Sequence, residues 1–198
     1  MKKLIVPRKF VSLLPPSVGG CFKEWAQFMY NSVQFNMPDS PIHATSHCER
    51  VLLYALLVGA KILGQEGKSL VSLAHAAIFH DTRRLHDGRD TGHGARAAAY
   101  YTEFCNGRDD IKYCPIAACL MKYHDIDDAK GEAAIAQEFP DCAERVILLY
   151  RIFKDADALD RWRLGRRGLD PRYLRTPDAD GLTGFSRKLV EVTTLEDW

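Results

Sequence analysis

The sequence has little net charge, no long apolar run and no closely paired cysteines, and each absence excludes a class of protein. Lys and Arg number 27 and Asp and Glu 26, for a formal net charge of +1. The chain as a whole therefore lacks the excess positive charge that would attract nucleic acid or an anionic membrane surface. No stretch approaches the roughly 18 uninterrupted apolar residues of a membrane span. The six cysteines contain no C-x-x-C, so we expect reduced thiols and no disulfide framework.

The N-terminal residues begin like a signal peptide, but the apolar run stops early. Pro7, Arg8 and Lys9 interrupt it long before the length of a signal-peptide core. We therefore expect a cytoplasmic protein with no membrane partner.

Apolar residues recur mainly three and four positions apart, which is typical of amphipathic helices. With 198 residues, of which 46% are hydrophobic, the chain is long enough for one domain. We expect an all-α, compact bundle of about seven or eight helices. The expected helices cover residues 22–35, 46–63, 69–81, 92–105, 111–124, 131–138, 143–164 and 185–194. Residues 1–45 would form a helical extension packed on the core, and 166–184 a loop covering one face.

Several of these helices carry a titratable residue on their apolar face. In 46–63, His47, Val51, Tyr54 and Val58 are spaced by four, three and four residues, so the histidine points inward. The same reasoning applies to His80, Asp81, His93, His124 and Asp157. Buried carboxylates are costly unless they are paired or bind a metal, and two of them among four imidazoles suit a divalent cation.

Three segments together resemble the HD-domain superfamily, whose signature is a His, then His-Asp, then a distant Asp. They are H-C-E-R-V at His47, A-A-I-F-H-D at His80 and Asp81, and K-D-A-D-A-L-D-R ending at Arg161. The resemblance covers residues 46–163, and it makes 46–198 an HD domain with a C-terminal loop and helix. It implies that His47, His80, Asp81 and Asp157 bind one divalent metal in a helical bundle. It also implies the hydrolysis of phosphate esters.

Two further histidines occupy positions at which some members of that superfamily bind a second metal. His93 lies in D-T-G-H-G and His124 in K-Y-H-D, and here the chain is similar to dinuclear nucleotide hydrolases of the YqeK type. Asp81 would then bridge two ions. His93 follows Asp81 closely in sequence, so it could instead bind the phosphate of a substrate.

The expected activity is that of a phosphohydrolase in which a metal-activated water cleaves a phosphomonoester or phosphodiester. His80 and Asp81 are the expected catalytic residues, and a small phosphorylated molecule such as a nucleotide is the expected substrate. No cysteine belongs to the ligand set, so Mn, Fe, Co, Ni, Mg or Zn could serve, with one or two ions per chain. A bound cation would acidify water towards neutrality.

A phosphate substrate also requires fixed positive charge near the metal. Arg83 and Arg84 follow the His-Asp pair, and Lys154 and Arg161 flank Asp157 at helical spacings. These four are the candidate substrate-binding residues, and the planar fork of arginine suits phosphate oxygens. Arg50, one turn after His47, fits an ion pair that holds its helix in place.

The remaining histidines have simpler interpretations. His43 precedes a helix in a proline-flanked segment, and His75 lies in an almost wholly apolar helix. His86 lies in a charged loop that directly follows the His-Asp pair, so we expect this loop to lie near the metal.

Two other functions are compatible with the same residues. Mixed-valence di-iron oxygenases use the HD fold with a His, His-Asp, His, His, Asp set, and this sequence supplies every member in order. Alternatively, W-R-L-G-R-R-G at 162–168 could contact nucleic acid or a nucleotide, with the metal serving a structural role. Hydrolysis is the commoner activity on this fold, and near-zero net charge makes nucleic acid an unlikely partner.

Overall fold

Ten α-helices and three short 3₁₀ helices form this computed structural model, which describes residues 3–65 and 67–194. The α-helices are α1 (Arg8–Val11), α2 (Pro16–Ser32), α3 (Thr45–Leu63), α4 (Gly67–Phe79), α5 (His93–Cys105), α6 (Pro115–Tyr123), α7 (Asp128–Glu138), α8 (Ala143–Leu159), α9 (Pro177–Asp180) and α10 (Thr183–Thr193). The 3₁₀ helices are η1 (Pro140–Cys142), η2 (Asp160–Leu164) and η3 (Pro171–Tyr173). No strand occurs in the described ranges, so the prediction of an all-α fold is confirmed. Eight of these α-helices have nine residues or more, in line with the expected seven or eight.

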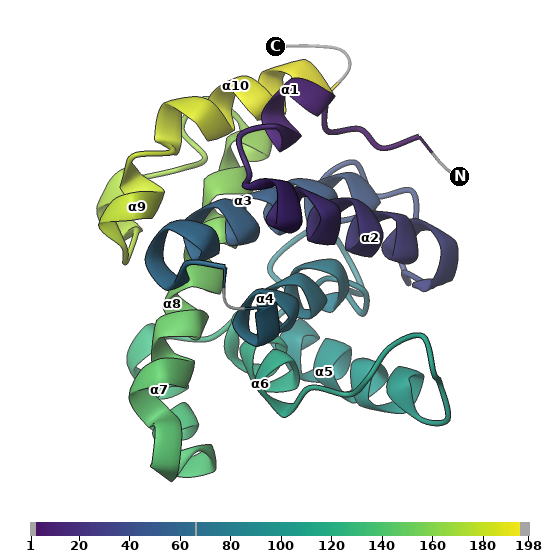
Figure 1. Cartoon of the computed structure of the whole chain (residues 1–198), viewed down its shortest axis with the longest axis vertical. Helices are drawn as coiled ribbons and strands as arrows, with labels where there is room; N and C mark the ends of the chain where they lie inside the picture. Colours follow the sequence, from purple (N-terminus) through teal and green to yellow (C-terminus); the bar gives the residue numbers. More distant parts are fainter. Residues whose placement is uncertain (1–2, 66, 195–198) are drawn as a thin grey trace.

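Helix α3 runs through the middle of the bundle and is buried along most of its length (Figure 1). It packs against α2, α4 and α8. It ends at Leu63, and the next residue, Gly64, has a φ of 66°, in the left-handed region that favours glycine. Gly59 allows α4 to approach closely, because a Cβ at this position would lie 2.8 Å from Leu73 Cδ1. This close packing places the first turn of α3 beside the end of α4.

Some helices begin at residues other than those predicted. Helix α2 begins at Pro16, whereas its start was expected at residue 22, and the glycine pair 19–20 lies inside it. Helix α6 begins at Pro115 instead of residue 111. Proline suits the first helical turn, and the Cys114 side chain accepts a hydrogen bond from the Ala117 amide.

Two helices end earlier than predicted, and both ends lie next to the titratable residues. Helix α4 ends at Phe79, so His80 and Asp81 belong to the turn that follows it. Helix α8 ends at Leu159 and continues as η2, where a single helix to residue 164 was expected.

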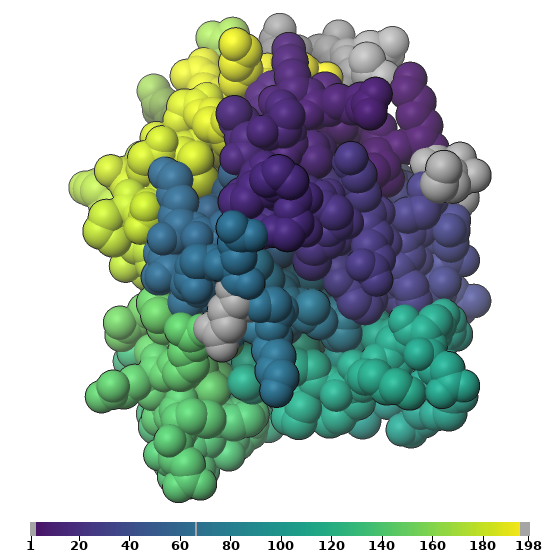
Figure 2. Space-filling view, in the orientation of Figure 1, coloured from purple at the N-terminus to yellow at the C-terminus, as the bar shows by residue number. Residues whose placement is uncertain are grey.

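The N-terminal segment packs on the rest of the chain. Helix α2 lies against α3 and α4, and Phe10 of α1 meets Phe185 of α10 with ring centroids 5.4 Å apart. In Figure 2 the purple N-terminal segment adjoins the yellow C-terminal helices on the face shown. Buried hydrophobic residues from Val6 to Leu189 form one connected core.

The segment 166–184 contains short helices and is not a simple loop. It includes η3 and α9, and α9 packs against α3 and α8. Arg175 fixes the segment to the bundle through Asp155 and Asp128, with nitrogen–oxygen distances of 3.1 and 2.8 Å.

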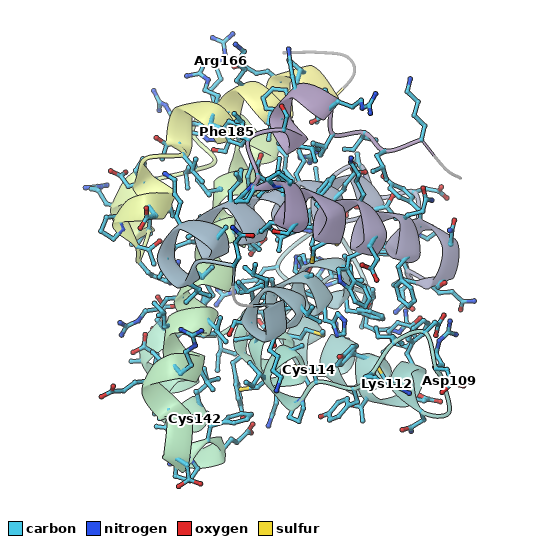
Figure 3. All side chains as sticks on the ribbon, viewed as in Figure 1. Asp109, Lys112, Cys114, Cys142, Arg166 and Phe185 are labelled. Carbon is cyan, nitrogen blue, oxygen red and sulfur yellow. The ribbon has the colours of Figure 1, made fainter. Side chains whose placement is uncertain are left out.

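All six cysteines are free thiols, as the sequence predicted. Cys114 and Cys142 lie at separate places in the lower part of Figure 3. Within the described ranges, no helix is both long enough and apolar enough to cross a membrane.

Candidate metal centre

Six metal-ligand candidates from five parts of the chain meet beside the end of α4. They are His47 of α3, His80 and Asp81 after α4, His93 of α5, His124 after α6, and Asp157 of α8. Five of the six are buried, whereas the Asp157 side chain is one-third exposed, at 33%. The structure therefore brings together all of the ligands expected from the sequence, including the pair for a second ion.

Four donor atoms form the first group, which we call site A. It comprises His47 Nε2, His80 Nε2, Asp81 Oδ2 and Asp157 Oδ1. The His47 atom lies 3.1 Å from His80, 3.3 Å from Asp157 and 3.5 Å from Asp81. His80 lies 3.9 Å from each carboxylate oxygen. Donors that share an ion at roughly 2.0–2.2 Å lie about 3–4 Å apart, so one cation fits among these four.

Three donor atoms form the second group, site B, which uses the other oxygen of Asp81. His93 Nε2 lies 3.0 Å from Asp81 Oδ1 and 2.8 Å from His124 Nε2. His124 Nε2 lies 3.9 Å from the same oxygen. The Asp81 carboxylate therefore connects the sites, with Oδ2 in site A and Oδ1 in site B.

Each of the four imidazoles is oriented by a hydrogen bond at its other ring nitrogen. The Nδ1 partners are Asp160 Oδ2 for His47 at 2.8 Å, Ala77 O for His80 at 2.9 Å, Asp90 O for His93 at 2.6 Å and Met121 O for His124 at 2.7 Å. These oxygens can only accept, so Nδ1 carries the hydrogen and each Nε2 presents a lone pair to the centre. Metal-binding histidines show this arrangement.

The imidazoles and carboxylates of the two sites are therefore better accommodated with a metal ion between them than without one. With the hydrogen on Nδ1 of each ring, the Nε2 lone pairs of His47 and His80 would face each other at 3.1 Å and those of His93 and His124 at 2.8 Å, and Arg84 Nη1 also lies 3.2 Å from His93 Nε2. Neighbouring lone pairs repel unless a cation lies between them. Buried His and Asp groups here could hold a metal ion.

Electrostatics keep the carboxylates of the centre ionised and two of the imidazoles neutral. Burial acts to raise the pKa of Asp81, but His80 and the hydrogen bonds from His43 and His93 outweigh it and hold the pKa well below its usual value. Burial lowers the pKa of His80 to about 3. It also lowers the pKa of His124. Ionised carboxylate and neutral imidazole are the forms that bind metal.

A buried ion pair supports His47 from behind. Asp160 accepts hydrogen bonds from Arg50 Nε at 2.6 Å and Nη2 at 2.9 Å, as well as from His47. Both residues of the pair are fully buried. The expectation that Arg50 pairs with a carboxylate is confirmed. Its partner Asp160 is the aspartate of L-D-R, a residue that was not among the expected site residues.

A pocket of about 670 Å³ opens above the centre, lined by Asp81, His93, His124 and Asp157. Three of the four predicted substrate-binding residues, Arg84, Lys154 and Arg161, also line it. Lys154 is held at the wall by Ile126 O at 2.7 Å and Asp128 at 2.5 Å.

The structure places Arg83 away from the pocket, which corrects the expectation for this residue. Its guanidinium lies 3.3 Å from the centroid of the Tyr100 ring. Its Nη1 donates to the carbonyls of Gln34 and Thr82. Successive residues of a turn point in different directions, so only Arg84 of the pair reaches the site.

His43 also belongs to the site, although it was not among the expected site residues. Its Nδ1 lies 2.8 Å from Asp81 Oδ2, and it lines the pocket. Its position four residues before His47, about one helical turn, was the sequence feature that could have indicated this role. His75 is a core residue hydrogen-bonded to Tyr101, as expected. His86 is exposed and does not line the pocket.

Comparisons with family models, curated proteins and solved structures found no match to this chain. The geometry of the centre is therefore the basis for assigning a function.

Proposed function

We propose that the chain is a metal-dependent phosphohydrolase of the HD-domain type that binds two divalent cations. The observation that carries this proposal is the position of Asp81, whose two oxygens belong to two separate groups of histidine and carboxylate donors. Two divalent cations held by these donors would be suited to stabilise the attacking and the leaving oxygen of a displacement at phosphorus. The resemblance of H-C-E-R-V, H-D and K-D-A-D-A-L-D-R to the superfamily supports the same assignment.

The cations would supply Lewis acidity, which makes a bound water acidic and polarises the phosphoryl oxygens. The protein's own residues provide the rest. His47, His80 and Asp157 hold their donor atoms in place, and Asp160 keeps His47 in the required tautomer. His and carboxylate donors without cysteine are compatible with Mn, Fe, Co, Ni, Zn or Mg.

The substrate is a small phosphorylated molecule, for which a nucleotide was the expectation from sequence. The pocket above the centre carries basic side chains on its wall, among them Arg84 and Arg161. Positive charge at this position suits a phosphate ester.

The double variant His80→Ala with Asp81→Ala tests the proposal. Asp81 contributes to both sites and His80 to site A, so we expect metal content near zero by elemental analysis. We also expect no phosphate release in a screen of phosphate esters, while helical content by circular dichroism is largely kept. Full hydrolytic activity in this variant would refute the assignment.

A mixed-valence di-iron oxygenase is the second candidate, because the six residues of sites A and B match the His, His-Asp, His, His, Asp set of such enzymes. Iron at two ions per chain with consumption of oxygen would support it. Phosphate release with Mn or Mg, without oxygen uptake, would support hydrolysis.

A further inference from the structure

Two arginines lie near the Asp81 carboxylate: Arg84 contacts one of its oxygens directly, and Arg163 contacts His43, which contacts the other oxygen. Arg84 Nη1 lies 3.5 Å from Asp81 Oδ1, on the side of site B. Arg163 Nη2 lies 3.5 Å from His43 Nδ1, which itself contacts Asp81 Oδ2 at 2.8 Å, on the side of site A. Both arginines line the pocket.

Both guanidinium groups are fixed in place but incompletely paired. Arg84 Nη2 donates to Gly88 O at 2.7 Å, and Arg163 Nε donates to Ile42 O at 2.6 Å. Arg84 Nε and Arg163 Nη1 are buried and have no hydrogen-bond partner among the described residues. The Arg84 side chain is 8% exposed and the Arg163 side chain 5%. A buried cation with an unused donor is costly, and an entering anion would remove that cost.

The carboxylate nearest to Arg163 is already used by other residues. Asp160 Oδ2 lies 3.8 Å from Arg163 Nη1, and that carboxylate accepts hydrogen bonds from both Arg50 and His47. Lys154 differs from the two arginines, because Asp128 already neutralises it. The guanidinium groups of Arg84 and Arg163 can therefore still form ion pairs and hydrogen bonds with an anionic ligand.

We propose that Arg84 and Arg163 form a clamp for a terminal phosphate and that the substrate is a phosphomonoester. This inference rests on the proposed function. A phosphomonoester is a dianion with three non-bridging oxygens, whereas a phosphodiester carries one negative charge and two non-bridging oxygens. The monoester therefore offers two guanidinium groups more charge and more hydrogen-bond acceptors than the diester does.

The reaction then produces inorganic phosphate. Water adds to phosphorus, and the ester bond between phosphorus and oxygen breaks with its electron pair on the alcohol oxygen. That oxygen takes a proton and leaves as an alcohol. Inorganic phosphate keeps the charge and the oxygens that the clamp recognises, so it serves as a probe.

Calorimetric titration of inorganic phosphate into the full chain, with and without Mn²⁺, tests the clamp. We expect Arg84→Met and Arg163→Met each to weaken phosphate binding at least tenfold, with and without the metal. Arg83→Met, outside the pocket, should bind phosphate as the unaltered chain does. Arg84→Lys and Arg163→Lys keep the charge and should show intermediate losses, so they decide the matter if a methionine variant fails to fold.

A comparison of p-nitrophenyl phosphate with bis(p-nitrophenyl) phosphate tests the substrate class. We expect kcat/KM to favour the monoester at least a hundredfold, and this preference to shrink in the arginine variants. Preference for the diester, or phosphate affinity unchanged in the arginine variants, would overturn the inference. A chain that binds no metal would overturn the proposed function instead, while the titration without metal still decides the clamp.

Discussion

The Nε2 atoms of His93 and His124 lie 2.8 Å apart, although the Nδ1 atom of each ring faces a backbone carbonyl oxygen. The carbonyls fix the hydrogens on Nδ1, so two lone pairs meet across this short distance. Asp81 Oδ1 lies 3.0 Å from His93 and adds negative charge at the same point. Burial acts to lower the pKa of His93, yet the hydrogen bond and charge of Asp81 raise it overall, so this ring takes up a positive charge, whether a proton or a metal ion, more readily than a free imidazole does. Three donors around one point favour a cation there.

Replacing one donor of site B should remove one ion and leave the other. We expect two ions per chain in the unaltered protein and one in His124→Ala, because site A keeps all of its donors. Elemental analysis after dialysis measures this ratio. His86→Ala, which changes an exposed histidine outside the pocket, should retain two ions. Two ions in His124→Ala would show that this histidine does not bind metal.

Asp160→Asn should weaken both the fold and site A. The substitution keeps the shape of the side chain but leaves the Arg50 charge buried without its counter-ion, at a cost of about 3–5 kcal/mol. It also removes the carboxylate that orients His47, and loss of such a partner lowers metal affinity roughly 10–100-fold. Urea unfolding of the metal-free chain measures the first effect, and competition with a chelator measures the second.

Asp110→Asn is the matched control for this change, because Asp110 also pairs with an arginine but at the surface. Its stability and metal affinity should stay close to those of the unaltered chain. If Asp160→Asn behaves like Asp110→Asn, the buried pair does not support the centre.

Gly94→Ala should disturb site B by steric contact. Helix α5 passes close to the end of α6, and a Cβ on Gly94 would lie 2.8 Å from His124 Nδ1 and 3.0 Å from Asp125 Oδ1. Overpacking of this kind costs about 1–3 kcal/mol, and the displaced imidazole should bind its ion more weakly. Gly20→Ala is the control, since a Cβ there meets nothing within 4 Å in α2. That variant should gain about 0.5–1 kcal/mol in unfolding free energy. Equal metal affinity in both variants would argue against this packing role.

The six candidate ligands could be predicted from sequence because each lies at the apolar face of a helix or directly after one. Helical periodicity reports the direction of a side chain, so it placed His47 and Asp157 toward the same interior. The periodicity says nothing about which atoms of a side chain meet. That Asp81 contributes Oδ2 to site A and Oδ1 to site B follows only from the distances of these atoms to His47 and His93.

Residues outside regular helices were the ones that sequence patterns missed or misplaced. His43 lies in the turn before α3, and Asp160 begins η2 after α8 has ended. Arg83 and Arg84 are neighbours in a turn, where no periodicity decides which of them faces the pocket. These positions depend on the tertiary packing of α3, α4 and α8.

A buried histidine outside the centre should make stability depend on pH. Burial lowers the pKa of His75 from 6.5 to about 4 in the folded chain. The unfolded chain therefore takes up a proton as the pH falls through 6.5, while the folded chain stays neutral at this residue until about pH 4. The contribution is fully present above pH 6.5 and is lost as the pH falls towards 4, by about 2 kcal/mol between pH 7.5 and pH 5.

The variant His75→Gln isolates this contribution, because glutamine does not titrate and can still hydrogen-bond to Tyr101. Urea unfolding of both chains at pH 7.5 and pH 5, with a chelator present, removes any effect of metal release. The fall in unfolding free energy should be smaller in His75→Gln by about 2 kcal/mol, since only the histidine is protonated in the unfolded state. An equal fall in both chains would mean that His75 titrates normally in the fold. The imidazole would then be reached by solvent, contrary to its 2% exposure beside the Trp25 ring.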